Sequence, residues 1–380
     1  MRQTLLKTQT EIEKAFLVGV DRKASAGNWP IESSLEELSY LARTAGAKVV
    51  GRLDQKLERP SPTHYLGKGK LEELIKLREH LTYSMVIFND ELSPRQQRNL
   101  EEALEVKVID RTALILDIFS RRAQTREGQL QVELAQHQYL LPRLAGQWSH
   151  LERLGGGIGT RGPGESQLET DRRLIRRRIH RLQSQIEAVR RHRALYRQKR
   201  KRSHIPIVAL VGYTNAGKST LLNALSQAGV LTEDKLFSTL DPVTRRLALP
   251  NGQQFLLTDT VGFIHKLPPS IVAAFRATLE ELAEADLLLH IVDITHQNAA
   301  EQFQTVEEIL ADLKLADKPQ ITVLNKIDVI GNQEEMNALA QTKHGKPPDD
   351  TTVVISALKG WGLDKVLAKI AAYLAKIPKS

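Results

Sequence analysis

The stretch IPIVALVGYTNAGKST constrains the fold more than any other part of the chain. An apolar run ends at Gly212, four residues follow, and Gly217-Lys218-Ser219 opens the segment STLLNALSQAG. This order predicts a buried strand, a glycine loop and a helix. Backbone N–H groups of such a loop and of the helix N-terminus cradle phosphates. Lys218 would reach the β- and γ-phosphates, and the Ser219 hydroxyl would bind Mg²⁺.

Three further motifs each end an apolar run, in FLLTDTVG, ITVLNKID and VVISALKG. In the first, Asp259 would hold Mg²⁺ through water, and the Gly262 N–H would touch the γ-phosphate. In the second, Asp328 would accept two hydrogen bonds from the edge of guanine, which adenine cannot supply. In the third, backbone N–H groups of residues 356–358 would complete the base pocket. Four motifs in this order predict a P-loop GTPase domain of the translation-factor type, which hydrolyses GTP to GDP and phosphate.

The segment KLFSTLDPVTRR, between the first two motifs, must supply a threonine to Mg²⁺. Thr239 and Thr244 are both available, and we favour Thr239. Phe263 follows Asp-Thr-Val-Gly, where many related GTPases carry a water-orienting glutamine. The group that positions water must therefore come from another residue, an ion or a partner. Asn215 can help hold K⁺ beside the phosphates, although a loop-stabilising amide explains it equally well.

The predicted catalytic residues are Lys218, Thr239 and Gly262, and the predicted Mg²⁺ ligands are Ser219, Thr239 and, through water, Asp259. The predicted GTP-binding residues lie in five segments: Gly212, Tyr213, Thr214, Asn215, Ala216, Gly217, Lys218, Ser219 and Thr220; Phe237, Ser238, Thr239, Leu240 and Asp241; Asp259, Thr260, Val261 and Gly262; Asn325, Lys326, Ile327 and Asp328; and Ser356, Ala357 and Leu358.

Residues 1–110 alternate between short apolar runs and amphipathic segments, which predicts a small parallel α/β domain. One helix should begin at Ser93, a favourable N-cap, with Pro94 in its first turn. Gly67-Lys68-Gly69 opens another helix and reads as a tight helix entry more readily than as a phosphate site. Residues 204–380 return to strand–helix alternation and carry the GTPase motifs, so the predicted fold class is α/β.

Residues 111–203 differ from both neighbours. Apolar residues recur every three or four positions in two stretches, which predicts two helices that cover each other as an antiparallel hairpin arm. Each helix would have roughly 30 residues and a length of about 45 Å. Pro142 should bend or end the first helix.

The glycine-rich loop, residues 154–166, would form the tip of this hairpin. It contains G-x-G-x-x-G but lacks the preceding strand that a dinucleotide site needs, so we reject a dinucleotide site here. Residues 172–202 hold 14 Lys or Arg and one acid, although the whole chain has a net charge of only +9. A concentrated basic stripe favours a polyanion partner. The predicted RNA-binding residues are Arg161, Arg172, Arg173, Arg176, Arg177 and Arg181, and a connector without a partner is the alternative for the loop.

The chain contains no cysteine, which excludes disulfides and cysteine-based zinc sites and fits a reducing cytosol. Its apolar runs are short and interrupted by charge, so we expect no membrane insertion. We expect a cytoplasmic monomer whose association with a membrane, if there is one, passes through ribosomes.

The arm, the glycine loop and the GTPase motifs together resemble the HflX family, within the Obg-HflX-like GTPases. The resemblance covers nearly all of the chain and is most specific in FNDELSPRQQRNLEE, LGGGIGTRGPGESQLETDRR and GYTNAGKST. It implies binding to the large ribosomal subunit and its rRNA, with the arm reaching toward the peptidyl transferase centre. It also implies splitting of stalled or idle 70S ribosomes, GTP hydrolysis stimulated by the ribosome, and weak ATP binding through the N-terminal region. In such proteins the threonine of STLD binds Mg²⁺, which supports Thr239.

Some members of that family continue into a C-terminal domain, and we expect any ribosome contact of that domain to be absent or replaced here. Two other functions stay open: a GTP-dependent switch acting on tRNA, and a switch acting on a membrane or protein signalling partner. A lipid-binding helix has bulky apolar residues opposite its charges, whereas the basic helix here has a narrow stripe suited to a partner helix.

Overall fold

The protein is seen in a computed structural model that describes residues 12–22, 29–144, 163–202, 205–226, 236–237, 239–268, 271, 281–331 and 351–376. Within residues 163–202, side chains are described for 169–193. The chain divides into two compact units, one of residues 1–118 and 145–154, and one of residues 119–144 and 155–380. The sequence predicts three regions, whereas the structure has two units, because the second unit holds both the helical arm and the GTPase motifs.

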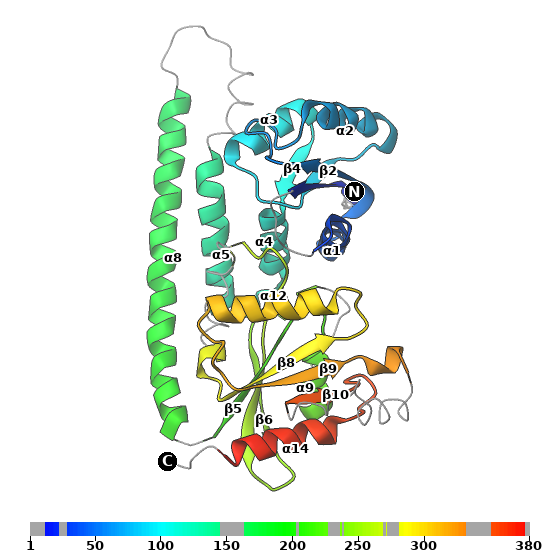
Figure 1. The fold of residues 1–380 in the computed structure, drawn as a ribbon. Coiled ribbons are helices and arrows are strands. Elements are labelled where there is room, and N and C mark those ends of the chain that lie inside the picture. The colour runs from blue at the N-terminus through cyan, green and yellow to red at the C-terminus, as the bar shows by residue number, and fades with distance from the viewer. Residues whose placement is uncertain are drawn as a thin grey trace, which may run out of the picture. The chain divides into compact units, whose positions relative to one another are not determined.

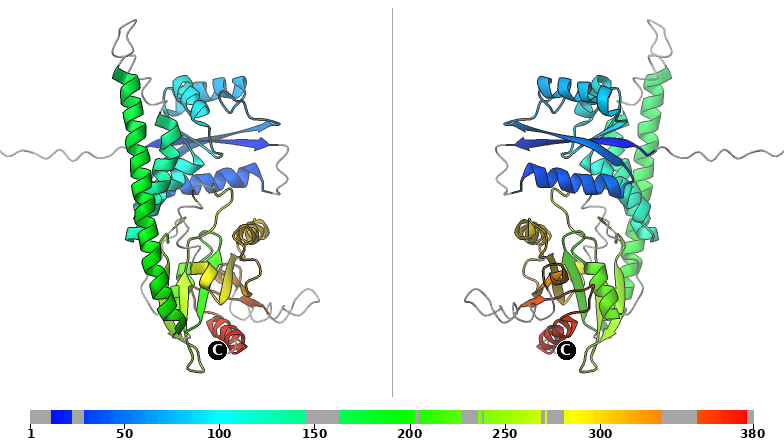
Figure 2. Two further views of the ribbon diagram at one scale, coloured as in Figure 1. Left: turned by 90° about the vertical axis from the view of Figure 1, so that its left-hand side faces the viewer. Right: turned by 90° about the vertical axis from the view of Figure 1, so that its right-hand side faces the viewer.

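In the first unit, the described residues form a four-stranded sheet in the order β2-β1-β3-β4 (Figure 1). All neighbouring strands are parallel, as the sequence predicts. The elements are β1 Lys14–Arg22, α1 Ile31–Thr44, β2 Lys48–Leu57, α2 Lys68–Leu81, β3 Met85–Phe88, α3 Pro94–Leu104, β4 Lys107–Asp110 and α4 Arg111–Arg122, of which the residues from Phe119 onward belong to the second unit. Helices α2 and α3 pack on one face of the sheet through Leu74, Leu100 and Leu104, and α1 lies on the other face (Figure 2).

The predicted helix start at Ser93 is confirmed. The Ser93 hydroxyl accepts a hydrogen bond from the Gln96 N–H, and the Gln96 side chain accepts one from the Ser93 N–H. This capping box satisfies donors that the first turn of a helix leaves unpaired. Pro94 follows at the first helical position.

The arm belongs to the second unit. Its helices are α5 Arg126–Leu140 and α8 Pro163–Arg202, and the 3₁₀ turn η1 Leu141–Arg143 follows α5. The predicted first helix of roughly 30 residues is wrong, because α4 ends at Arg122 and α5 begins at Arg126. Thr125 caps α5, since its hydroxyl accepts a hydrogen bond from the Gly128 N–H. Pro142 lies in η1, directly after α5, as expected.

Helices α5 and α8 lie side by side and antiparallel (Figures 1 and 2). Arg178 Nε donates to Glu133 Oε1 at 2.8 Å, and Arg193 Nε lies 3.2 Å from Glu127 Oε2. As residue numbers rise along α8, those of its partners fall along α5, which fixes the antiparallel direction. The apolar stripe of α8 is covered most fully at Leu182, which is buried completely.

The rest of the second unit is a six-stranded sheet, counted over its described residues, in the order β10-β9-β8-β5-β7-β6. All pairs are parallel except β6 with β7. Helices α9 and α14 cover one face through the main apolar core, and α12 covers the other (Figure 1). The elements are β5 Ile207–Gly212, α9 Lys218–Ser226, β6 Val243–Ala248, β7 Gln254–Asp259, β8 Leu287–Asp293, α12 Ala299–Asp312, β9 Gln320–Asn325, η2 Ile327–Val329, β10 Thr352–Val354 and α14 Leu363–Leu374.

Candidate functional site

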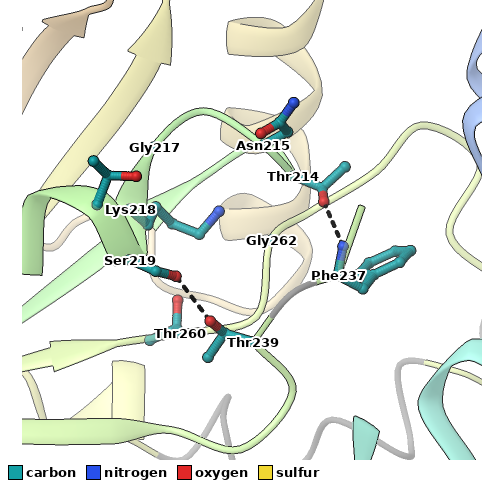
Figure 3. Close-up of a pocket in the computed structure, with 10 residues that line it drawn as sticks. Thr214, Asn215, Gly217, Lys218, Ser219, Phe237, Thr239, Thr260 and Gly262 are labelled. Carbon is teal, nitrogen blue, oxygen red and sulfur yellow. Dashed lines mark hydrogen bonds between the residues drawn. The ribbon is translucent and has the colours of Figure 1, made fainter. Parts of the chain in front are cut away.

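A polar pocket lies at the carboxyl end of β5, the strand with β8 on one side and β7 on the other. Connections leave a sheet in opposite directions at such a strand, and ligands bind in the crevice that this opens. The pocket is lined by Thr214, Asn215, Gly217, Lys218, Ser219, Thr220, Phe237, Thr239, Thr260 and Gly262 (Figure 3). All ten are residues that the sequence predicts for GTP binding.

Lys218 begins α9 and is buried. Its Nζ donates to the carbonyl oxygens of Tyr213 at 2.8 Å and Gly212 at 3.2 Å, so the side chain runs back along the loop. Burial lowers the pKa of Lys218 to about 8, and the Asp259 carboxylate acts in the opposite direction. A buried ammonium of this kind is stabilised by an anion placed beside it.

The three predicted Mg²⁺ ligands lie together. Ser219 Oγ donates to Asp259 Oδ2 at 2.6 Å. The same Ser219 oxygen lies 2.8 Å from Thr239 Oγ1 (Figure 3). Burial raises the pKa of Asp259, while Lys218 and the hydrogen bonds from Ser219 and Thr239 act the other way. Asp259 Oδ1 is buried and meets no hydrogen-bond donor among the described residues. Thr244 lies apart, on β6, where its hydroxyl pairs with that of Thr258 at 2.9 Å.

Gly262 passes directly against the phosphate loop. A Cβ at Gly262 would lie 2.5 Å from Thr214 Cα and 2.9 Å from Lys218 Nζ, so only glycine fits without a shift of backbone. The next residue, Phe263, is buried, and its backbone pairs with the loop: Thr214 N–H donates to its carbonyl at 2.7 Å, and its N–H donates to Gly212 at 3.1 Å. The Phe263 side chain does not line the pocket.

Asn325 joins three loops. Its Nδ2 donates to the Ala216 carbonyl at 2.9 Å, and its Oδ1 accepts the Ala357 N–H at 2.9 Å. A Cβ at Gly217, whose φ is +96°, would lie 2.2 Å from Asn325 Nδ2. The buried amide therefore connects the phosphate loop to the Ser-Ala-Leu segment. The sequence predicts Asn325 as a GTP-binding residue but does not reveal this bridging position.

Lys326 is held by a residue that the sequence motifs did not reveal. Its Nζ lies 2.7 Å from Asp293 Oδ2, at the end of β8. Asp293 also accepts hydrogen bonds from the N–H and the hydroxyl of Thr295, at 3.0 and 2.6 Å. The apolar run ending in this acid is the signal that could have identified it, because β8 ends at the same sheet edge as β5 and β9. Asp328 lies in η2 and is half-buried, whereas Ile327 is part of the core.

The Ser-Ala-Leu segment is a tight turn. Ser356 and Trp361 exchange both backbone hydrogen bonds at 3.1 Å, and Ser356 Oγ accepts the Lys359 N–H at 3.0 Å. The Ser356 and Ala357 N–H groups are thus engaged by Trp361 and Asn325. Of the three N–H groups predicted to complete the base pocket, the one at Leu358 is left for a ligand by these contacts.

Of the residues around Thr239, some line the pocket and others pack or bind elsewhere. Phe237 lines the pocket, and its N–H donates to Thr214 Oγ1 at 3.0 Å (Figure 3). Leu240 is buried outside the pocket lining. Asp241, predicted to bind GTP, does not line the pocket either, because its carboxylate accepts hydrogen bonds from the start of α5. Ser238 lies outside the described residues.

The remaining predicted GTP-binding residues belong to the phosphate loop or to the Asp-Thr-Val-Gly motif. Tyr213, Ala216 and Val261 are buried, and the Tyr213 hydroxyl accepts the His265 N–H at 2.7 Å. Thr260 lines the pocket while its hydroxyl donates to the Leu210 carbonyl at 2.5 Å. Asn215 is exposed and has φ of +63°, a left-handed conformation that asparagine tolerates better than most residues.

On α8, the predicted RNA-binding residues Arg173, Arg176, Arg177 and Arg181 are exposed, and Arg172 is half-buried. Within the described chain, none of these five pairs with an acid, in contrast to Arg178 and Arg193. Arg161 and the glycine-rich loop lie outside the described residues.

Among the described residues, no cluster of three or more His, Cys, Asp or Glu could hold a metal ion. A Mg²⁺ site of the expected kind needs no such cluster, because one carboxylate, hydroxyls and nucleotide phosphates suffice. None of the described helices is both long and apolar enough to cross a membrane.

Three family models match the chain in order. They are described as GTP-binding GTPase N-terminal, over residues 32–120, GTP-binding GTPase Middle Region, over 122–200, and 50S ribosome-binding GTPase, over 207–326. In solved structures, the chain is similar to a GTP-binding protein from Sulfolobus solfataricus in complex with GDP. That chain is 26% identical with a TM-score of 0.46, and the match covers 97% of this chain and 100% of that one.

Curated relatives match over most of their own length. The GTPase HflX of Caldanaerobacter subterraneus is 55% identical over 319 residues, which cover 83% of this chain and 74% of the relative. The GTPase HflX of Lacrimispora saccharolytica is 51% identical, with 93% and 81% covered, and that of Escherichia coli is 44% identical, with 90% and 79% covered. From the pocket geometry, the ordered family models and these relatives, we conclude that the chain belongs to the HflX family of GTPases and is a GTP hydrolase.

Proposed function

We propose that this GTPase binds the large ribosomal subunit and the 70S ribosome, and splits stalled or idle ribosomes with GTP hydrolysis that the ribosome stimulates. The observation that carries the proposal is the row of exposed arginines on α8, which pair with no acid among the described residues and lie in the same compact unit as the nucleotide pocket. A family model described as a 50S ribosome-binding GTPase, matching residues 207–326, supports the same partner.

The pocket residues fit Mg²⁺-GTP. Ser219 and Thr239 offer hydroxyl oxygens 2.8 Å apart, and Asp259 would act through water with its unpaired Oδ1. A bound Mg²⁺ would bridge the phosphates and neutralise charge that develops during hydrolysis. Lys218, which donates to two loop carbonyls, would turn to the β- and γ-phosphates. The Gly262 N–H would meet the γ-phosphate, since its backbone lies against both Thr214 and Lys218.

Guanine would be read beside the loops that Asn325 joins. Asp328 would accept hydrogen bonds from the base, and the Leu358 N–H would bind its keto oxygen. Lys326, fixed by Asp293, would cover the base with its aliphatic stem. Adenine would leave the Asp328 carboxylate without donors, which costs a few kcal/mol.

Slow intrinsic hydrolysis and stimulation by a partner follow from Phe263. Its buried side chain has no hydrogen-bonding group, so it cannot orient a water molecule. A ribosomal group, or a K⁺ ion beside Asn215, would assist hydrolysis in place of a water-orienting side chain at position 263. Free protein would then hydrolyse GTP slowly until it meets its target.

The arm would bind rRNA through its positively charged side chains. Arg173, Arg176, Arg177 and Arg181 can contact phosphates, and each such contact releases counterions. Arg178 and Arg193 serve a different purpose, because they pair with acids of α5 and keep the two arm helices together. The exposed arginines can therefore be changed without removing the pairs that hold the arm.

Sucrose-gradient sedimentation with a non-hydrolysable GTP analogue tests the partner, and light scattering of 70S ribosomes tests splitting. The test variant carries Arg176→Gln, Arg177→Gln and Arg181→Gln. The control carries Lys365→Gln, Lys369→Gln and Lys376→Gln, an equal charge change on and after α14. We expect co-migration with large subunits, and splitting that the arm variant loses and the control keeps. Migration with tRNA or with anionic vesicles, and not with subunits, would support a rival function.

A further inference from the structure

Two residues that flank Thr239 are held by the end of α4 and the start of α5. On one side, Phe237 packs edge-on against Phe119, with ring centroids 4.8 Å apart and both rings buried. On the other side, Asp241 binds the N-terminal end of α5. All these residues belong to the same compact unit. The segment that carries the proposed Mg²⁺ ligand is thus anchored to α4 two residues before Thr239, and to the start of α5 two residues after it.

The Asp241 contact uses both carboxylate oxygens. Oδ2 accepts the N–H groups of Gln124 and Thr125, each at 2.8 Å, and Oδ1 accepts the Thr125 hydroxyl. That hydroxyl also accepts the Gly128 N–H at 3.0 Å as the N-cap of α5. The first N–H groups of a helix have no partner inside it, and its N-terminus favours negative charge. The carboxylate therefore satisfies the N–H of the N-cap residue Thr125 and that of Gln124 just before it.

Gly128 leaves room for this contact. A Cβ at Gly128 would lie 2.3 Å from Asp241 Oδ1, so a larger residue would push the carboxylate away. Glycine inside the first turn lowers helix stability relative to alanine. The close approach of Asp241 explains why a glycine stands at this helical position.

The same turn of α5 is joined to the rest of the arm. Glu127 lies next to Gly128, and its Oε2 lies 3.2 Å from Arg193 Nε of α8. Arg193 Nη2 also lies 3.6 Å from Glu281 Oε1, on the helical segment before β8. The first turn of α5 is thus linked directly to α8, the helix with the exposed arginines.

We propose that the start of α5 is a positioning element for GTP hydrolysis: Thr125 and Gly128 hold Asp241, and thereby hold Thr239 beside Ser219 and Asp259. This inference rests on the proposed role of Thr239 as a Mg²⁺ ligand. Thr125, Gly128 and Asp241 are positioning residues, since none of them lines the pocket. Coupling between two sites is reciprocal, so a nucleotide that engages Thr239 also stabilises the contact between Asp241 and the arm.

The test measures steady-state GTP hydrolysis by the full chain as a function of Mg²⁺ concentration. Thr125→Ala removes the hydroxyl, Gly128→Ala displaces the carboxylate without removing a polar group, and Thr125→Ser restores a hydroxyl. We expect Thr125→Ala and Gly128→Ala to raise the half-saturating Mg²⁺ concentration about fivefold, or ~1 kcal/mol. Both should lower kcat with KM for GTP little changed, and Thr125→Ser should behave as the parent protein.

Two controls separate positioning from folding. Ser93→Ala removes the N-cap of α3 in the other unit, so it reproduces the loss of a helix cap without touching this segment. Thr244→Ala removes a nearby threonine hydroxyl that faces Thr258. Neither should change the Mg²⁺ dependence, even where the melting temperature falls. A melting curve for each variant confirms that rates are compared between folded proteins.

Thr239→Ala serves as the reference. If Thr239→Ala raises the Mg²⁺ requirement while Thr125→Ala and Gly128→Ala leave it unchanged, the positioning role is wrong and the proposed function stands. If Thr239→Ala itself has no effect on the Mg²⁺ requirement, the metal assignment fails, and the inference that rests on it fails too. Equal changes in Ser93→Ala and Thr125→Ala would also overturn the inference, because they would reflect loss of a cap alone.

Discussion

Ser219 Oγ donates a hydrogen bond to Asp259 Oδ2 over 2.6 Å, joining the first turn of α9 to the end of β7. Thr239 Oγ1 lies 2.8 Å from the same serine oxygen. Three oxygen-bearing side chains from separate motifs thus converge at one point. They are neutral or singly charged, which suits a cation that also binds phosphates.

The first prediction separates the two threonines of the segment after α9. Thr239→Ala should raise the Mg²⁺ concentration needed for half-maximal GTP hydrolysis roughly tenfold, because a metal ligand is removed. Thr244→Ala should leave that concentration unchanged, since its hydroxyl pairs with Thr258. Titration of hydrolysis with Mg²⁺ measures both. Similar curves for the two variants would contradict the assignment.

The second prediction concerns base recognition. Asp328→Asn should weaken GTP binding by roughly 100-fold, because two hydrogen bonds to a charged group disappear, about 3 kcal/mol in total. Binding of xanthosine triphosphate should improve, since the amide can donate to its keto oxygen. Competition against a fluorescent GDP analogue measures both affinities. An unchanged preference for GTP would remove Asp328 from the base pocket.

The third prediction follows from the buried Lys218, whose pKa is lowered to about 8 by burial. Phosphates stabilise the charged form, so GTP binding raises this pKa. Above pH 8 the free lysine is neutral, and binding must take up a proton, so GTP affinity should fall as pH rises past 8. Near pH 9, about one proton should be taken up per GTP, and almost none near pH 6.5.

Calorimetry in two buffers with different ionisation enthalpies measures this proton uptake. Lys218→Arg is the control, because arginine stays charged throughout this range. Uptake by the arginine variant equal to that of the parent protein would assign the proton to another group.

The fourth prediction tests Asn215 as a K⁺ ligand. GTP hydrolysis should be faster in KCl than in NaCl at equal ionic strength, and Asn215→Gly should abolish the difference. Glycine is the right replacement because Asn215 has φ of +63°, where a β-carbon strains most other residues. A salt preference that survives in Asn215→Gly would leave Asn215 as a loop-stabilising amide.

The fifth prediction concerns the arm. Neutralising Arg176, Arg177 and Arg181 should weaken binding to large subunits and flatten its salt dependence, by roughly one unit of slope for each phosphate that an arginine no longer neutralises. A pelleting assay across a salt series gives both quantities. GTP binding should be unchanged, since these residues are exposed and lie outside the pocket. A slope equal to that of the parent protein would mean that these arginines face solvent in the complex.

Features that depend on neighbours in the chain could be predicted from the sequence. The strand, glycine loop and helix around Lys218 follow from one contiguous stretch, because glycines and a helix N-terminus create a phosphate site within a few residues. The helix start at Ser93 and the helix end near Pro142 are local in the same way. The sequence wrongly predicted one long first arm helix. The apolar residues keep their helical spacing from α4 into α5, so the spacing gives no sign that the helix is interrupted at Thr125.

Features that join distant residues were decided by the tertiary structure. Asn325 Nδ2 reaches the carbonyl of Ala216, 109 residues away, and Asp241 binds Thr125, 116 residues away. Neither partner is marked by spacing or composition, because their proximity depends on strand order and on where each helix packs. The sequence alone determined which chemical groups are available at the nucleotide site. Only the folded chain decided that Thr239 and not Thr244 lies beside Ser219, and that Asp241 faces the arm and not the nucleotide pocket.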